Sequence, residues 1–235
     1  GRIKADRIRM TSTPKPPQGA VERFIALGEC TSLVSDVMDE LGIEEGAIGA
    51  SVLRPTIPGK LMVGQALTVR NIRRRVDPFV AAKNNQNGMA EFEAHNLAED
   101  GDVLVISGVS GVSNMGGISS LTGQRQGERG AVVMGGVRDV RHSRSIDYPV
   151  WASEITPVTG KWRIETVEIN GEIQMGNVRV NPGDLVIADD TGVVFVPRDR
   201  IIDVIELCEK KKKGEDSRIG SINEGVPVPV FYNKG

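Results

Sequence analysis

Apolar residues recur at helical spacing soon after Thr31. The positions that would share one face of a helix are Leu33, Val34, Val37, Met38 and Leu41. Thr31 or Ser32 can cap the first turn, and Gly42 stands where helices commonly end on a left-handed residue. The pattern therefore predicts an amphipathic helix over residues 33–41.

Short apolar runs in the middle of the chain predict a buried sheet. Residues 103–107 and 131–134 are mainly apolar, and the polar stretch 118–129 between them has helical character. Because a helical crossover joins strands in parallel, we expect these two runs to form parallel, buried strands. A strand pair or one bulged strand is expected at 59–70, and a further helix at 89–98.

Beyond Pro149 the pattern changes to short strands and tight turns. Residues 163–169 and 172–175 flank Asn170-Gly171, a dipeptide typical of hairpin turns, so these two strands are expected to pair. A final amphipathic helix is expected at 199–213. The whole pattern predicts an α/β protein with a β-rich C-terminal half.

The same patterns divide the chain into three segments. Residues 1–19, with five basic residues and three prolines, predict an arm that is extended or disordered, with packing on a neighbouring molecule as one option. Residues 20–225 are expected to form one α/β domain, and residues 226–235 a C-terminal tail. No apolar run exceeds four residues, which argues against a membrane span or signal peptide and favours a cytoplasmic protein.

Composition narrows the chemistry more than it narrows the fold. The chain has 235 residues, with 29 Lys and Arg against 31 Asp and Glu, and this net charge of −2 gives no reason to expect nucleic-acid or membrane partners. Its two His and two Cys are far apart, which argues against zinc sites, iron–sulfur clusters and disulfide scaffolds. Catalysis would then depend on carboxylates, Arg, backbone amides or an oxygen-ligated metal.

Two glycine-rich stretches follow the expected parallel strands. The loop 108–117 can cradle an anion with its backbone amides, although tight packing alone also explains its glycines. The stretch 135–139 predicts a turn that sets Arg138 beside Asp139, where the carboxyl ends of parallel strands place ligands. Arg138 can fork onto a carboxylate or carbonyl and Asp139 can bind a hard cation, with an ordinary surface ion pair as the alternative.

The remaining polar candidates have simpler interpretations. His95 and His142 are isolated in the sequence, and Cys208 falls on the apolar side of the final helix. Three carboxylates stand in turns that favour Asp for backbone reasons, namely Asp184, Asp189 and Asp190.

Five stretches in this order make the chain resemble the family of the regulator of ribonuclease activity A. That family also contains class II pyruvate aldolases acting on 4-hydroxy-4-methyl-2-oxoglutarate and 4-carboxy-4-hydroxy-2-oxoadipate. The stretches are SDVMDELG (35–42), VGQALTV (63–69), GDVLV (101–105), RGAVVMGGVRDV (129–140) and NPGDLVIADDTGVVFVP (181–197). The resemblance covers about residues 20–225 and implies a single domain of the swivelling β/β/α type, a layered α/β sandwich. It also implies a homotrimer or homohexamer with its sites at subunit interfaces.

The resemblance further implies roles for particular residues. Asp139 would bind Mg²⁺ or Mn²⁺, and Arg138 would face the keto oxygen of a small 2-oxo acid, where enolate charge develops. Glu215, near the end of the final helix, would reach the metal-bound waters of an adjacent subunit. The pyruvyl carboxylate would meet backbone amides in the loop formed by Gly116, Gly117, Ile118 and Ser119.

Two departures from the family pattern stand out. An acidic residue usually follows the glycine that matches Gly116, but this chain has Gly117, so Glu215, Asp36 or a water would take that part, or the reaction differs. The stretch 73–87 is also unusual for the family, so substrate selectivity does not carry over.

The leading hypothesis is a divalent-metal-dependent lyase that cleaves a 4-hydroxy-2-oxo acid to pyruvate, with oxaloacetate decarboxylation as a related activity. The alternative is a non-catalytic, protein-binding regulator of an endoribonuclease, which the missing acid at Gly117 favours. Some family members are labelled demethylmenaquinone methyltransferases. This chain, however, has no glycine-rich nucleoside fingerprint followed by a ribose-binding acid.

Overall fold

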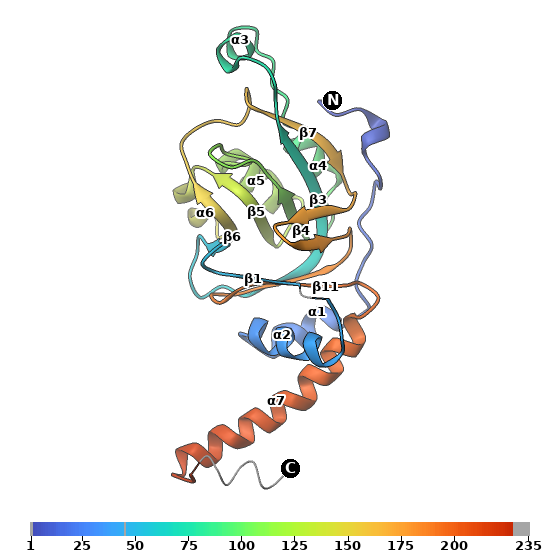
Figure 1. Cartoon of the computed structure of the whole chain (residues 1–235), viewed down its shortest axis with the longest axis vertical. Coiled ribbons are helices and arrows are strands. Elements are labelled where there is room, and N and C mark those ends of the chain that lie inside the picture. The colour runs from blue at the N-terminus through green and yellow to red at the C-terminus, as the bar shows by residue number, and fades with distance from the viewer. Residues whose placement is uncertain (1, 45, 228–235) are drawn as a thin grey trace.

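A computed structural model describes residues 2–44 and 46–227 and has a large mixed sheet at its centre (Figure 1). Hydrogen-bonded neighbours follow the order β1-β11-β10-β3-β4-β5-β6-β2, and β7 pairs separately with β3. The bounds are β1 Ala47–Gly49, β2 Arg54–Pro55, β3 Met62–Arg73, β4 Asp102–Ser107, β5 Gly130–Val137, β6 Val150–Ile155, β7 Ile164–Ile169, β10 Leu185–Ala188 and β11 Gly192–Val196. A separate two-stranded sheet consists of β8 Ile173–Met175 and β9 Val178–Val180.

Helices pack around this sheet in two groups. One group, α1, α2 and α7, contacts β10 and β11, and the other, α4, α5 and α6, lies beside β3, β4 and β5 (Figure 1). The sheet and the helices packed on it form the body of the molecule. The last turns of α7 extend away from this body at one end, and α3 projects from the other end (Figure 1). Their bounds are α1 Ala20–Ala26, α2 Thr31–Glu40, α3 Pro78–Lys83, α4 Glu91–Leu97, α5 Gly117–Arg125, α6 Val140–Ser145, α7 Ile201–Asn223 and the 3₁₀ helix η1 Ala5–Arg7.

The parallel strands β3, β4, β5 and β6 confirm the expected α/β sheet. Leu67, Leu104 and Ala131 align across the first three of them and are fully buried. The helix α5 forms the crossover between β4 and β5, as the sequence predicts. Of the two options for residues 59–70, the single bulged strand is the one observed, since β3 shifts register between Arg70 and Asn71. The carboxyl ends of β3, β4 and β5 meet along one edge of the sheet.

The predicted first helix is present, but its start differs from the expectation. Thr31 is the first helical residue and Cys30 precedes it, so neither Thr31 nor Ser32 is the cap. The N-cap residue Cys30 makes no capping hydrogen bond with its side chain. The carboxylate of the distant residue Asp189 instead accepts hydrogen bonds from the backbone amides of Cys30 (3.1 Å) and Thr31 (3.0 Å). At the other end, Gly42 adopts the expected left-handed conformation, with φ of 62°.

The hairpin expected at Asn170-Gly171 is not formed. β7 pairs with β3 instead of β8, because the long strand β3 offers β7 a buried partner. β8 pairs with β9 around Gly176-Asn177, where Gly176 has φ of 62°. The dipeptide Asn170-Gly171 continues alongside β3, since the Asn170 amide donates to the Thr68 carbonyl and the Thr68 hydroxyl donates to the Gly171 carbonyl. The two strands that flank it enter different sheets.

Three element bounds also differ from the sequence expectation. β5 continues through Gly135 and Gly136 to Val137, so these glycines belong to the strand and not to a turn. Glycine is required at residue 136 because the strand passes close to the neighbouring loop, and a Cβ there would lie 2.5 Å from the carbonyl oxygen of Val112. α5 ends at Arg125, before the expected residue 129, and α7 continues to Asn223, beyond the expected residue 213.

The N-terminal arm packs on its own chain. The amide of Arg9 donates to the carbonyl of Ile169 at 2.9 Å, and its guanidinium Nε lies 2.5 Å from the Glu168 carboxylate. The arm is thus mainly extended, with one 3₁₀ turn, over residues 2–19. Most of the expected C-terminal tail, residues 228–235, lies outside the described residues. Within the described part of the chain, no helix is both long and apolar enough to span a membrane.

Candidate active site at the carboxyl edge of the parallel strands

Arg138 and Asp139 lie directly after β5 at the edge where the parallel strands end. Asp139 has a left-handed backbone, with φ of 57° and ψ of 34°, which Asp tolerates better than most residues. Its carbonyl accepts the amide of His142 at 2.9 Å and so starts α6. The backbone thus turns sharply at Asp139 and presents its carboxylate beside the glycine-rich loop.

Gly116 and Gly117 touch this pair. A Cβ on Gly116 would lie 2.8 Å from Asp139 Oδ2 and 3.2 Å from Arg138 Cγ, so only glycine fits there without movement. The amide of Gly117 donates to Asp139 Oδ2 at 3.1 Å, and the amide of Arg138 donates to the carbonyl of Met115 at 3.2 Å. The close approach of the two stretches explains the glycines and holds the carboxylate in place.

The Arg138 guanidinium is partly open to solvent beside the Asp139 carboxylate. Its Nε lies 3.7 Å from Asp139 Oδ2, and the two side chains are 32% and 53% exposed. A pair this exposed contributes only about 0–1 kcal/mol to folding. Both side chains are therefore accessible to a small anion or a cation.

The glycine-rich loop is organised by Asn114, which the sequence analysis did not single out. Its buried side-chain amide donates to the carbonyls of Val109, Val112 and Gly136 at 3.0–3.2 Å. Its oxygen accepts from the Val109 amide and from the side chain of Asn71. The available signal was a single Asn inside a glycine-rich loop, but its partners come from two other strands.

Glu154 holds the outer end of the same loop. Its carboxylate accepts from the Ser110 hydroxyl at 2.5 Å and from the Gly111 amide at 2.7 Å. These two donors lower the pKa of Glu154. The guanidinium of Arg73, at the end of β3, donates to the Ser110 carbonyl at 2.7 Å and so ties the loop to a second strand.

The side chain of His142 lies beside Gly117, the position at which the resemblance implies an acidic residue. Three atoms of His142, an exposed residue of α6, lie 3.1 Å from the place that a Cβ on Gly117 would take. A side chain at residue 117 therefore requires His142 to move. His142 borders the candidate site, although it stands alone in the sequence.

Ile118 and Ser119, which also belong to the loop expected to bind the substrate carboxylate, face solvent and the protein interior respectively. Ile118 is 73% exposed, whereas Ser119 is buried. The amides in the first turn of α5 lack intrahelical acceptors, as at any helix start. Ser119 Oγ lies 2.7 Å from Nε2 of His95, which is fully buried and therefore not the isolated residue that its sequence position suggests.

The buried imidazole of His95 is the centre of a four-residue chain of hydrogen bonds. Its Nδ1 lies 2.7 Å from Glu128 Oε1, and the Tyr148 hydroxyl donates to Glu128 Oε2 at 2.6 Å. Burial, followed by the nearby Glu128 carboxylate, raises the pKa of Tyr148 well above its ordinary value, so its hydroxyl stays protonated. These residues come from separate segments of the chain, and no local motif marks them.

Glu215 lies apart from the other site residues within one chain. It belongs to the last turns of α7, residues 214–223, which extend away from the body that carries α5 and α6 (Figure 1). The structure thus brings Gly116, Gly117, Arg138 and Asp139 together but leaves Glu215 separate.

The donor set at Asp139 fits a hard divalent cation. Within residues 2–44 and 46–227, no group of three His, Cys, Asp or Glu gathers in a way that could hold a metal. Mg²⁺, however, commonly keeps several waters and needs only one or two protein carboxylates. The half-exposed carboxylate of Asp139 meets that requirement, and the partly exposed Arg138 beside it can hold an anionic ligand.

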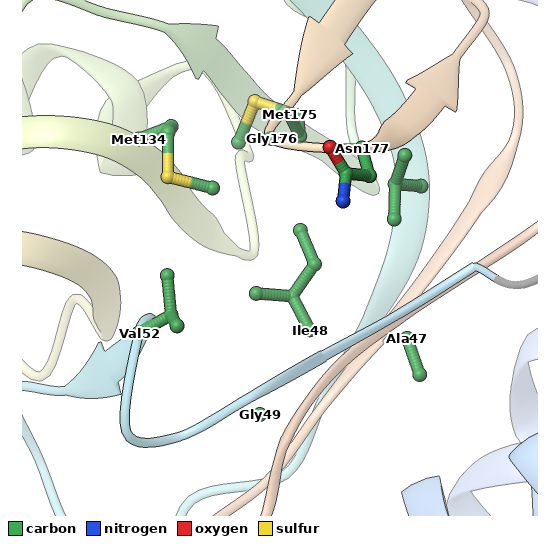
Figure 2. A pocket seen from close by; sticks show the side chains of 9 residues that line it. Ala47, Ile48, Gly49, Val52, Met134, Met175, Gly176 and Asn177 are labelled. Carbon is green, nitrogen blue, oxygen red and sulfur yellow. The ribbon is translucent and has the colours of Figure 1, made fainter.

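A separate apolar cavity lies on another part of the sheet (Figure 2). It has a volume of about 380 Å³ and contains no titratable side chain, so it lacks the groups that acid–base or metal chemistry requires. Its lining consists of Ala47, Ile48, Gly49, Val52, Met134, Met175, Gly176, Asn177 and Val178.

The structure is an α/β fold in which Arg138 and Asp139 lie together at the carboxyl ends of the parallel strands. A family model described as RraA-like (Aldolase/RraA) matches residues 31–195, and the chain belongs to this family. This agrees with the resemblance found in the sequence.

Individual relatives are distant. The protein DlpA of Legionella pneumophila is 29% identical over 87% of this chain, which spans about a third of DlpA's length (33%). A provisionally named 4-hydroxy-4-methyl-2-oxoglutarate aldolase of Halalkalibacterium halodurans is 28% identical over 86% of this chain and 89% of its own. The crystal structure of Streptomyces coelicolor RraAS2, described as an unusual member of the RNase ES inhibitor RraA protein family, has the same fold. Its TM-score is 0.74 and its identity 23%, over 87% of this chain and 98% of its own.

Proposed function

We propose that this protein is a divalent-metal-dependent lyase that cleaves a 4-hydroxy-2-oxo acid to pyruvate and a second oxo compound. The observation that carries the proposal is the Arg138–Asp139 pair, held against Gly116 and Gly117 at the carboxyl edge of the parallel strands. Membership of the Aldolase/RraA family and similarity to a provisionally named aldolase support the same class of reaction.

Cleavage of the C3–C4 bond requires an electron sink that accepts the electron pair of the broken bond. Removal of the 4-hydroxyl proton breaks the C3–C4 bond and moves its electron pair onto the C2 carbonyl, which leaves the second oxo compound and the enolate of pyruvate. Protonation of C3 then gives pyruvate. Arg138 stabilises the enolate oxygen, and this interaction strengthens as charge develops in the transition state.

Asp139 is the residue that would hold Mg²⁺ or Mn²⁺. A bound cation of this kind acts as a Lewis acid that polarises the 2-oxo group. Gly116 and the first turn of α5, from Gly117 to Ser119, would receive the pyruvyl carboxylate through the amides of Ile118 and Ser119, because amides without intrahelical acceptors at a helix start favour an anion. Oxaloacetate decarboxylation leaves the same enolate, so we propose it as a second activity of this site.

We further propose that the protein acts as a homotrimer or a homohexamer. The hydroxyl proton needs an acceptor, and the last turns of α7, which carry the candidate Glu215, extend away from the body of their own chain (Figure 1). Glu215 of a neighbouring subunit would take and return this proton through water. The exposed side chains of Ile118 and Ile155, 73% and 63% accessible, give the site edge an apolar border that a second subunit can cover.

Pyruvate release from a panel of 4-hydroxy-2-oxo acids and oxaloacetate, coupled to lactate dehydrogenase, tests the proposal. With Mg²⁺ or Mn²⁺ we expect turnover that EDTA and Asp139→Asn abolish. Arg138→Ala should lower kcat by about 10²–10³-fold with a smaller change in KM. Arg179→Ala, which breaks an exposed pair with Glu172 far from the loop in sequence, serves as the control and should leave kcat unchanged. Pyruvate release that persists in EDTA and in Asp139→Asn contradicts the mechanism.

A non-catalytic regulator of an endoribonuclease is the second candidate. Gly117 supports it, because the resemblance implies a carboxylate at this position and the chain has none there, with His142 beside it. Absence of turnover with every substrate, together with inhibition of an endoribonuclease by the purified protein, would favour the regulator over the lyase.

A further inference from the structure

We propose that His95 and Ser119 are positioning residues that hold the first turn of α5, and through it the Asp139 carboxylate, in the orientation that the site needs. This inference rests on the proposed lyase function. Ser119 lies two residues after Gly117, whose amide donates to Asp139 Oδ2. Whatever fixes the start of α5 therefore also fixes the carboxylate.

The donors and acceptors of the four buried side chains, Ser119, His95, Glu128 and Tyr148, can all be paired with one another. When the Ser119 hydroxyl donates to His95 Nε2, the Nδ1–H of His95 and the Tyr148 hydroxyl both donate to Glu128. Every donor then has an acceptor. Since all four residues are buried, loss of one member leaves a polar atom unpaired, which is costly.

The chain of hydrogen bonds joins α5 to three other segments. His95 belongs to α4, Glu128 precedes β5 and Tyr148 precedes β6. Contact is close, because a Cβ on Gly123 of α5 would lie 2.2 Å from Glu128 Oε2 and 3.0 Å from the Tyr148 hydroxyl. α5 therefore packs directly on the buried Glu128 carboxylate, at a distance that requires glycine at residue 123. Within this network, Ser119 makes the hydrogen bond that is closest in sequence to Gly117, the first residue of α5.

The order serine, histidine, glutamate matches that of a nucleophilic triad, but access differs. Ser119 is only 3% exposed and its hydroxyl faces the fully buried His95, so no substrate carbonyl reaches it in this conformation. A role in orientation agrees with this burial. The buried network holds the start of α5 in place, while the partly exposed Arg138 and Asp139 face the ligand.

Ser119→Ala tests the proposal by removing one oxygen, and Thr122→Ala is its matched control. Thr122 also lies in α5, but its hydroxyl bonds only to the Ile118 carbonyl on the exposed side. We expect Ser119→Ala to raise KM for the 2-oxo acid substrate about tenfold, with kcat within about threefold of the wild type. Oxalate, a non-reacting analogue of the enolate, should bind about tenfold more weakly. Thr122→Ala should change neither quantity.

Hydrogen exchange of the Gly117 and Ser120 amides, which donate to Asp139 Oδ2 and to the Gly116 carbonyl, gives a readout that needs no activity. It should accelerate at least about tenfold in Ser119→Ala and in His95→Ala, and remain unchanged in Thr122→Ala. If His95→Ala does not fold, Ser119→Ala decides alone. Unchanged exchange and unchanged oxalate affinity in Ser119→Ala would overturn the inference, as would labelling of Ser119 by a fluorophosphonate. A wild-type protein without turnover contradicts the lyase proposal, while the exchange experiment still tests the network.

Discussion

The imidazole of His142 lies over Gly117, with Cγ and Cδ2 3.1 Å from the place that a Cβ at residue 117 would take. The two residues are therefore coupled. A glycine at 117 allows His142 its position, and a side chain at 117 displaces the ring. A Cβ at residue 117 requires the exposed His142 ring to shift by a few tenths of an ångström.

Gly117→Asp should therefore destabilise the protein, and His142→Ala should reverse part of that loss. His142→Ala removes two of the three close atoms, so the pair should show a coupling of about 0.5–3 kcal/mol in a double-mutant cycle. Thermal or urea unfolding of the wild type, both single variants and the double variant measures it. Under the lyase proposal, the double variant should also have a higher kcat than Gly117→Asp. Strictly additive unfolding energies would show that the two residues are independent.

Asp189 should contribute far more to stability than its neighbour Asp190. Asp189 accepts hydrogen bonds from the Cys30 and Thr31 amides and from the Thr31 hydroxyl, so Asp189→Ala leaves buried donors unpaired. We expect a loss of about 3 kcal/mol, or roughly 6–12 °C in Tm. Asp190 is exposed and accepts only from the Gly59 amide, so Asp190→Ala should cost less than about 1 kcal/mol. Urea unfolding compares them, and equal losses would contradict the capping role.

Glu154 should make the glycine-rich loop sensitive to acid. Because the Ser110 hydroxyl and the Gly111 amide lower its pKa from 4.5, its stabilising effect is full above that ordinary value. The effect is then lost as the pH falls through the lowered pKa of the folded protein. The protection factor of the Gly111 amide against hydrogen exchange should fall over this acidic range in the wild type. In Glu154→Gln the exchange should be fast already at pH 7, and a wild-type profile in this variant would refute the anchoring role.

Cys30 and Cys208 should be unreactive in the folded protein. Burial raises the pKa of each thiol to about 12, so the reactive thiolate is scarce at pH 8. Both lie in the apolar cluster that joins α2 and α7 to the sheet. Ellman's reagent should label neither thiol at pH 8 in buffer, and both in guanidinium chloride. Rapid labelling of the native protein would show that this cluster opens.

Features that depend on neighbouring residues were predictable from the sequence. The period of apolar positions after Thr31 indicated α2, and Gly42 indicated its end. Continuous apolar runs separated by a helix indicated β4 and β5 as parallel strands. Such signals are local, because they reflect side-chain spacing and backbone conformation within one element.

Features that depend on distant partners were not predictable in this way. Asn170-Gly171 has the local signature of a hairpin, but β7 gains a better partner in β3. The amides of Cys30 and Thr31 are satisfied by Asp189, which lies more than 150 residues away along the chain. Local signals contain no information about such pairings.

By itself, the sequence determined the α/β class, the glycine-rich edge and the Arg138–Asp139 pair, because each is encoded in residues close together along the chain. Only the tertiary structure decided that His142 occupies the space beside Gly117 and that His95 joins Ser119 to Glu128. Those contacts exist because packing brings separate segments within van der Waals and hydrogen-bond distance. Buried polar groups must find their partners wherever the fold places them.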